Sequence, residues 1–236
     1  MKRIGVSDDV FYRNPGYIRG IVQATSINNG PAAADLVALL RTTEAHIRSS
    51  IPADKIAEQP QIASWREAFR RFGAKPTEYR PSIEAITRRV LKGDQIPSIS
   101  RVVDIGTIIS LKLLAPVGAH ATDVVSDGLE LRLATGEELF VALGSDVNDS
   151  PSPGEIIFVD GNVVATRRWV WRQGNHTVVT NETRAVEFNV DGLPPVTYDD
   201  VAQACEEVRE LGSRYCGGSW ESAILTRGRP HIPLRE

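Results

Sequence analysis

The order of apolar and polar positions predicts a mixed α/β chain. Apolar residues alternate with polar ones over 4–6 and 17–22, which is typical of strands. Helical spacing follows in three stretches, each marked by a proline or a glycine: 31–47, 62–72 and 81–93. Residues 102–114 are apolar on nearly every side, so we expect a helix buried at the centre of the fold.

The second half of the chain reads as strands followed by one helix. We predict a hairpin over 129–143, a second hairpin over 156–170 and a further strand over 184–190. Thr197 stands three residues before Asp200, as in a capping box, and begins a last helix with Gly212 near its end. After Cys216 we expect an irregular tail.

Residues 167–173, hereafter the Trp-rich segment, concentrate aromatic and basic chemistry. They hold two of the four Trp and three Arg, in a chain with only 6% aromatic residues. As a strand, the segment would place Arg167, Trp169, Trp171 and Gln173 on one face. Flat rings beside guanidinium and amide groups suit a nucleotide or an aminoacyl ester. A strand with both Trp in the core and the Arg at its rim is the alternative.

The composition is that of a soluble globular protein. With 236 residues, 42% of them hydrophobic and 24% charged, the chain has the size of one large domain or two small ones. Cys205 and Cys216 are three helical turns apart, so both can face the core from one helix but cannot form a disulfide along it. We expect a cytoplasmic protein with reduced thiols, because neither a membrane-spanning run nor the apolar region of a signal peptide is visible.

Charge is distributed unevenly along the chain. The net charge is −3, which argues against wholesale coating of nucleic acid. Residues 66–92, however, contain eight basic and three acidic residues and carry a net charge of +5. Such a patch can hold a phosphate backbone by counterion release. Two solvated helix faces are the alternative.

The usual signatures of catalysis are missing from the sequence. It contains no phosphate-binding or dinucleotide-binding glycine motif, no paired zinc cysteines and no nucleophile elbow. The four histidines are scattered. We therefore expect no metal and no cofactor.

Several short motifs do form a recognisable series. Three segments follow one another in order: 101–111 (RVVDIGTIISL), 115–119 (APVGA) and the Trp-rich segment with Thr177 and Glu182-Thr183. They are accompanied by FRRFG at 69–73, GLPPV at 192–196 and CGG at 216–218. This series resembles the stand-alone relatives of the B3/B4 domain, the editing module of the bacterial phenylalanyl-tRNA synthetase β subunit. The resemblance covers about residues 65–218.

The resemblance implies the α/β fold of the B3/B4 domain, in which helices flank a β-sandwich of unusual topology. It also implies three segments: N-terminal strands and a helix packed on the main domain, the editing-like domain itself, and an irregular tail (1–60, 61–218 and 219–236). In the synthetase, the domain hydrolyses tyrosine wrongly esterified to the phenylalanine tRNA. The implied pocket lies between segments that correspond here to 103–107, 116–118 and 169–173.

This sequence departs from the synthetase pattern inside that pocket. Gly106-Thr107 stands where the synthetase has Thr-Asn, and the pocket histidine near Gly118 is missing, with His120 two residues later. Bulky residues of the Trp-rich segment replace a small, glycine-rich strand, and the carboxylate that recognises tyrosine has no clear counterpart. A pocket is therefore expected, while its amino acid and its tRNA are not fixed.

Hydrolysis of an aminoacyl ester needs only a positioned water and donors for the developing oxyanion. Backbone N–H groups of the predicted 116–119 loop could serve as donors, since Gly118 allows close approach, although a turn after a helix explains that glycine equally. Asp104 could act in catalysis or hold a loop amide or Arg168. Thr107 could bind the ligand or its own helix carbonyl.

The first hypothesis is a free-standing, trans-acting aminoacyl-tRNA deacylase that takes the aminoacylated 3′ end of a tRNA, with no role for DNA or membrane. Its catalytic candidates are Asp104, Thr107, Gly118 and His120. Its substrate-binding candidates are Pro116, Val117, Ala119, Arg168, Trp169, Trp171, Arg172, Gln173 and Thr177. Its candidates for the tRNA backbone are Arg66, Arg70, Arg71, Lys75, Arg88, Arg89 and Lys92.

Two other hypotheses compete with the deacylase. A non-catalytic module that binds RNA or a small amino-acid-like or nucleotide-like ligand is favoured by the missing pocket histidine. A protein-interaction domain would use the Trp-rich segment as an exposed patch, with both Trp accessible and outside any cavity. The sequence does not indicate the oligomeric state.

Overall fold

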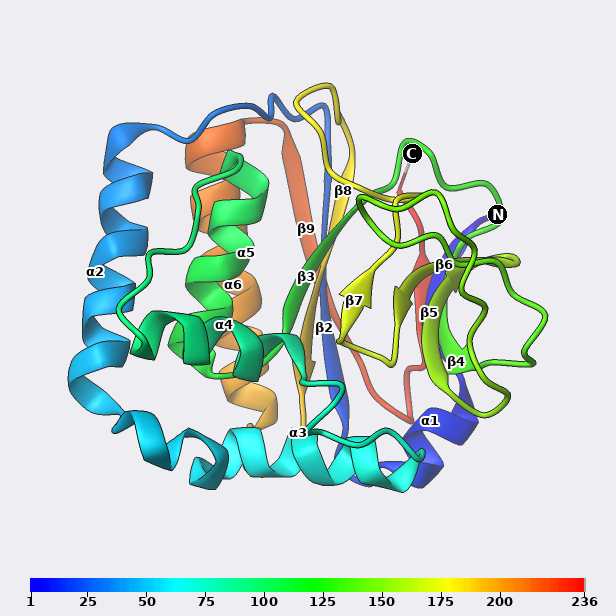
Figure 1. The fold of residues 1–236 in the computed structure, drawn as a ribbon. Coiled ribbons are helices and arrows are strands. Elements are labelled where there is room, and N and C mark those ends of the chain that lie inside the picture. Colours follow the sequence, from blue (N-terminus) through cyan, green and yellow to red (C-terminus); the bar gives the residue numbers. More distant parts are fainter. Residues whose placement is uncertain (236) are drawn as a thin grey trace.

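The computed structural model, which describes residues 1–235, builds the chain around two β-sheets (Figure 1). One sheet has six strands in the order β10-β1-β4-β5-β6-β7, and the other has four in the order β3-β8-β2-β9. The first consists of β10 (His231–Pro233), β1 (Arg3–Val6), β4 (Leu129–Leu133), β5 (Ile156–Asp160), β6 (Val163–Arg167) and β7 (Arg172–Gln173). The second consists of β3 (Val117–Ala121), β8 (Val186–Gly192), β2 (Ile18–Thr25) and β9 (Ser219–Leu225).

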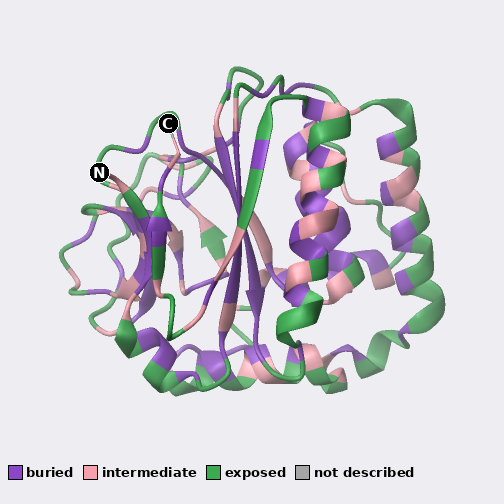
Figure 2. Cartoon of the chain, turned by 180° about the vertical axis from the view of Figure 1, so that it is seen from behind, coloured by how far each residue is buried: buried purple, intermediate pink, exposed green. Residues whose placement is uncertain are grey.

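Helices cover one face of the four-stranded sheet, and the six-stranded sheet lies against the other (Figure 1). The covering helices are α5 (Arg101–Leu113) and α6 (Tyr198–Cys216), with α2 (Ala34–Ser50) and α4 (Ser82–Leu91) packed on α5. The short α1 (Asp8–Arg13), the 3₁₀ helix η1 (Ala53–Glu58) and α3 (Pro60–Arg71) run along one end of the molecule. Seen from behind, the central strands β2 and β8 of the four-stranded sheet are mostly buried, whereas the edge strand β9 is largely exposed (Figure 2).

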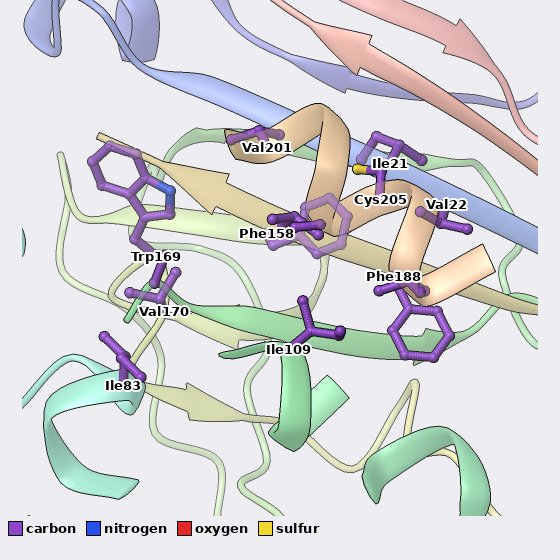
Figure 3. Close-up of a cluster of buried hydrophobic side chains, with 14 of the residues drawn as sticks. Ile21, Val22, Ile83, Ile109, Phe158, Trp169, Val170, Phe188, Val201 and Cys205 are labelled. Carbon is purple, nitrogen blue, oxygen red and sulfur yellow. The ribbon is translucent and has the colours of Figure 1, made fainter. Parts of the chain in front are cut away.

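Small residues set how closely α6 approaches its sheet. A Cβ at Gly20 in β2 would lie 2.8 Å from Val201 Cγ1, and one at Gly192 in β8 would lie 2.7 Å from Val201 Cγ2. Larger residues at either position would push the helix away, because packed interiors leave no spare volume. Cys205 of α6 packs in the same core, which reaches from Phe188 to Trp169 (Figure 3).

Strand β8 is buried along its whole length, yet it alternates apolar and polar side chains. Phe188 packs near Gly106 of α5, so the apolar positions face the helices. The polar positions lie on the opposite face, toward the six-stranded sheet, and there Asp191 bonds to Arg19 of the neighbouring strand β2. We call Arg19, His120, Glu187, Asn189 and Asp191 the polar layer; each is at most 6% exposed.

Most of the predicted elements are confirmed. Strands β1 and β2, helices α2 to α5 and the β5–β6 hairpin lie where the pattern placed them, within a few residues. The side chain of Thr197 accepts a hydrogen bond from the Asp200 N–H, and the Asp200 carboxylate accepts one from the Thr197 N–H, so the capping box of α6 is formed. Both cysteines are buried and free on α6. The expected α/β architecture is likewise confirmed, with helices flanking two sheets.

Two predictions of local structure are wrong. Residues 129–143 do not form a hairpin, because β4 pairs with β5, while Leu139 and Val141 make only isolated bridges. The segment after Cys216 is not an irregular tail, because β9 pairs with β2 and β10 pairs with β1. Both errors involve partners that are far away in the sequence. The three segments predicted from the resemblance, 1–60, 61–218 and 219–236, therefore all contribute strands to the same two sheets.

Residues 1–235 contain neither a helix that could span a membrane nor a cluster of metal-binding side chains. No helix in this range is both long enough and apolar enough to cross a lipid bilayer. The same range contains no cluster of three or more His, Cys, Asp or Glu arranged to hold a metal ion.

Candidate functional site

A cavity of about 140 Å³ opens between the polar layer, β3 and the Trp-rich segment. Eight predicted residues line it: Pro116, Val117, Gly118, His120, Trp169, Trp171, Arg172 and Gln173. Six further lining residues were not predicted: Arg19, Ser82, Phe158, Thr166, Val170 and Asn189. Of the three segments expected to form the pocket, 116–118 and 169–173 line this cavity and 103–107 does not.

The Trp-rich segment is not a single strand, which corrects the prediction. Strand β6 ends at Arg167, and only Arg172 and Gln173 form β7. Between them the chain turns, because Arg168 and Trp169 adopt φ values of 46° and 63° and the Trp171 N–H donates to the Arg167 carbonyl. Two successive non-glycine residues in the left-handed region cost about 1–3 kcal/mol each, and such strain is concentrated at functional sites.

The turn separates the two tryptophans, so the prediction that they share a face is wrong. Trp169 is 1% exposed and packs edge-on against Tyr17 and Trp65, with ring centroids 4.8 and 5.0 Å away. Trp171 is only half-buried and forms a wall of the cavity. Trp169 is therefore a core residue that also reaches the cavity, whereas Trp171 is a half-buried residue of the cavity wall. The hypothesis of an exposed interaction patch is excluded, because both Trp line a cavity and Trp169 is buried.

Trp171 is held in place from behind. Its ring meets Tyr79 edge-on at 5.1 Å, and the Arg168 guanidinium lies 4.5 Å from its ring centroid. The same guanidinium lies 3.7 Å from the Tyr79 ring centroid. Cation–π contacts of this kind fix the planes of the rings. Arg168 therefore supports the wall and does not itself line the cavity.

The predicted 116–119 loop is largely strand β3, an edge strand of the four-stranded sheet. The Asp191 N–H donates to the Pro116 carbonyl, and hydrogen-bonded pairs alternate along an antiparallel ladder. Gly118 should therefore bond to β8, while the backbone groups of Val117 and Ala119 face the open edge. The side-chain amide of Gln173 confirms this orientation, because Nε2 donates to the Ala119 carbonyl at 3.1 Å.

Arg19 forms the charged floor of the cavity. Its Nη1 donates to Asp191 Oδ1 at 3.0 Å, and its guanidinium carbon lies 4.2 Å from the Phe158 ring centroid. Tyr17 also donates to Asp191. Burial alone would lower the pKa of Arg19, but the nearby Asp191 carboxylate raises it above its usual value, so the guanidinium stays charged.

Glu187 and Asn189 complete the buried polar layer. Burial, reinforced by the charge of Asp191 and opposed by that of Arg19, raises the pKa of Glu187 to about 8. Its carboxyl is therefore mostly protonated at neutral pH. Asn189 Nδ2 donates to Asp191 Oδ2 at 2.6 Å, and Asn189 Oδ1 lies against Gly118, where an added Cβ would approach to 2.7 Å. A glycine is required there to leave room for this amide.

His120 lies in the cavity wall as a neutral imidazole. Burial and the charge of Arg19 lower its pKa to about 3. Its Nδ1 is 2.7 Å from Thr177 Oγ1 and its Nε2 is 3.4 Å from Thr166 Oγ1. Thr177 thus orients the histidine and does not line the cavity itself. A group with so low a pKa is a weak general base in this state.

Asp104 and Thr107 lie on α5 and do not line the cavity. The Asp104 carboxylate accepts from Ser98 Oγ and from the Ile99 N–H, so it holds the loop before the helix. Thr107 donates to its own helix carbonyl at Val103. In both cases the structure matches the alternative that the sequence left open, and their catalytic assignment has no geometric support.

The basic patch is partly neutralised by its own carboxylates. Arg66 and Arg88 both bond to the buried Glu84 at 2.8 and 2.9 Å. Arg70 pairs with Glu67, and Lys75 pairs with Glu78. Three predicted backbone contacts are exposed and form no ion pair within residues 1–235: Arg71, Arg89 and Lys92. Among the predicted contacts, these are the cations best placed to meet a phosphate.

Five of the six missed residues lie in segments that were predicted as strands, and Ser82 begins helix α4. Arg19 follows Tyr17-Ile18 and precedes Gly20-Ile21-Val22, and a charge inside so apolar a strand was the available signal. Asn189 alternates with Phe188 and Val190, a pattern that ordinarily places polar groups in solvent. Ser82, Thr166 and Phe158 carried no signal of their own.

Comparisons with known proteins identify the family of this chain. The family model described as B3/4 domain matches residues 64–217. A solved N-terminal fragment of the phenylalanyl-tRNA synthetase β subunit from Pyrococcus horikoshii is similar at 12% identity and a TM-score of 0.45. That match covers 91% of this chain and 49% of the other, so the chain spans about half the length of the synthetase fragment. No curated protein matches the sequence.

Proposed function

Since this chain belongs to the B3/4 domain family, we propose that it is a trans-acting deacylase that clears a wrongly charged tRNA. The observation that carries the proposal is the cavity itself. Its walls are strand β3 and the Trp-rich segment, two of the three segments that the resemblance assigns to the editing pocket, and Arg172 lies at its exposed rim. We propose the cytoplasm as its location.

The size of the cavity divides the ligand into two parts. Sites that enclose whole drug-sized ligands measure roughly 300–1,000 Å³. At about 140 Å³, this cavity accepts a small group such as an aminoacyl side chain. The terminal adenosine would then stay at the mouth, where the half-buried Trp171 offers a ring for stacking and Arg172 a cation for the phosphate.

The chemistry is an ester hydrolysis. A water adds to the ester carbonyl, the bond to the ribose oxygen breaks, and the proton of the water passes to that oxygen, releasing a free amino acid and an intact tRNA. The Val117 and Ala119 amides on the open edge of β3 are suited to stabilise the oxyanion. His120, held at Nδ1 by Thr177, would orient the water through Nε2, whose contact with Thr166 is long at 3.4 Å. The free hydroxyl of the terminal ribose would help to relay the proton.

The tRNA body would lie along the exposed cations of the basic patch, Arg71, Arg89 and Lys92. Such contacts are independent of sequence and would weaken as salt increases.

A panel of mischarged tRNAs tests the proposal. Each is incubated with the protein, and the release of amino acid is compared with release in buffer alone and with a folded Gly118→Ala variant. At least one mischarged tRNA should be deacylated faster than in buffer, with a slower rate for the variant. If no member of a complete panel is deacylated by folded protein, the proposed activity is wrong.

One observation favours a second function, a non-catalytic module that binds an amino-acid-like or nucleotide-like ligand or RNA. The pKa of His120 is lowered to about 3 by burial, so no residue of the described cavity stands out as a general base. Thermal stabilisation by an aminoacyl-adenosine analogue without turnover of any charged tRNA would support this alternative.

A further inference from the structure

The floor of the cavity contains donors that the protein does not use. Arg19 is 1% exposed, and its Nε and Nη2 have no hydrogen-bond partner among residues 1–235. Only Nη1 is satisfied, by Asp191 and Tyr17. Leaving a buried charged group unsatisfied costs more than the roughly 1–3 kcal/mol of a neutral one. These two nitrogens are therefore left for an acceptor that a ligand brings to the floor.

The same floor contains an acceptor that the protein does not use. Asn189 is 6% exposed, and its Oδ1 has no partner within the described chain. The orientation of the amide is fixed, because Nδ2 faces Asp191 and a carboxylate can only accept. Gly118 keeps the space beside Oδ1 free of a side chain. A ligand group that reaches the floor can therefore also donate.

The charge of the floor is already balanced without a ligand. Arg19 is paired with Asp191 at 3.0 Å. Burial raises the pKa of Glu187 to about 8 and lowers that of His120 to about 3, so both are mostly neutral at pH 7. An anion would gain from Arg19 but would face Asp191 and Asn189 Oδ1, and a cation would face Arg19. Neither charge satisfies both sets of unused groups.

We infer that the floor, formed by Arg19 and Asn189, selects a neutral polar side chain that carries both an acceptor and a donor, as a carboxamide does. The acceptor would bond to Arg19 Nε and Nη2, and the donor to Asn189 Oδ1. An apolar side chain of the same size would leave all three atoms unsatisfied. This specificity rests on the proposed function for the rest of the ligand, the aminoacyl ester.

Three amino acids of matched shape test the inference. Asparagine, aspartate and leucine carry side chains of four heavy atoms that differ only in polarity and charge, and glutamine, glutamate and methionine extend the series by one position. Each is attached to the same tRNA for deacylation assays and, as a non-hydrolysable amide, to 3′-aminoadenosine for binding assays. A site that hydrogen-bonds its substrate discriminates strongly against analogues lacking those groups. We expect at least a roughly 100-fold preference for a carboxamide over its apolar counterpart.

The two assays separate failure of the specificity from failure of the proposed function. A binding preference for the carboxamide without hydrolysis supports the inference and refutes the deacylase. Equal hydrolysis or binding of the leucine and asparagine compounds, a preference for the aspartate compound, or no binding at all overturns the inference.

An Arg19→Lys variant keeps the positive charge beside Asp191 but removes Nε and Nη2. It should lose at least tenfold of the preference for carboxamide over apolar compounds. Arg209→Lys is the matched control, since Arg209 pairs with Glu206 on α6, remote from the cavity, and should leave the preference unchanged. Should Arg19→Lys fail to fold, the wild-type series still decides the question.

Discussion

The two tryptophans of the Trp-rich segment should respond in opposite ways to the same truncation. Trp169→Ala removes a ring that is 1% exposed and packed between Tyr17 and Trp65. Core truncations of this type cost roughly 3–5 kcal/mol of unfolding free energy. For a chain of this length, 1 kcal/mol shifts Tm by roughly 2–4 °C, so we expect Tm to fall by roughly 6–20 °C.

Trp171→Ala should cost far less stability and more activity. It removes an edge-on contact with Tyr79, worth about 0.5–1.5 kcal/mol, and a partly exposed cation–π contact with Arg168, worth about 0.5–1 kcal/mol. The expected loss is therefore about 1–2 kcal/mol, or a few degrees in Tm. Stacking of a base on an aromatic ring contributes roughly 1–3 kcal/mol, so kcat/KM for deacylation should fall roughly 10- to 100-fold.

Thermal melts and initial rates of deacylation, measured on the same preparations, check both expectations. Tyr12→Ala serves as the control, because Tyr12 is an aromatic residue that is 74% exposed and should affect neither quantity. The assignment of Trp171 to the site is wrong if its alanine variant keeps wild-type activity, or if it melts as early as Trp169→Ala.

Three further predictions follow from the polar layer and from α5. Stability should fall above about pH 6.5, because Glu187 keeps its proton up to about pH 8 in the folded protein but not in the unfolded chain. It should also fall below about pH 4.5, because His120 binds a proton in the unfolded chain but stays neutral in the folded protein, where its pKa is about 3. Between these limits the two effects oppose each other, so urea titrations should show a plateau, and Glu187→Gln should abolish the alkaline loss of up to roughly 1.4 kcal/mol per pH unit. Gly118→Ala should displace the Asn189 amide and lower activity at least tenfold, while costing about 1–3 kcal/mol of stability, as kinetics and melts will show. Asp104→Ala should cost about 2–3 kcal/mol through the lost loop bonds but leave kcat of the folded protein unchanged; a large fall in kcat would restore its catalytic assignment.

The sequence predicts the helices well because their signals are local. Apolar spacing on α2 to α5 and the Thr197 capping box depend on residues within a few positions of one another. Strands such as β9 and β10 are stabilised by partners near the other end of the chain, so local patterns do not reveal them. The family motifs compensated for this at the site, where they located β3 and the Trp-rich segment.

What the sequence could not show depends on burial and backbone shape. Arg168 and Trp169 turn the chain without glycine or proline, so the segment looked like a continuous strand. The alternation of polar and apolar residues along β8 is typical of a strand with one wet face, yet that face is covered by a second sheet. Arg19 was therefore treated as an ordinary strand residue, although it forms the floor of the cavity.

Strand β2, which carries Arg19, lies outside the segment that the family model matches. The family model matches residues 64–217, which contain β8. They contain neither β2, which pairs with β8, nor β9, which pairs with the other edge of β2. A fragment cut at those limits would expose the edge of β8 and tend to aggregate. It would also lack Arg19. The segment that defines the family match therefore does not include the residue on which the proposed side-chain selectivity depends.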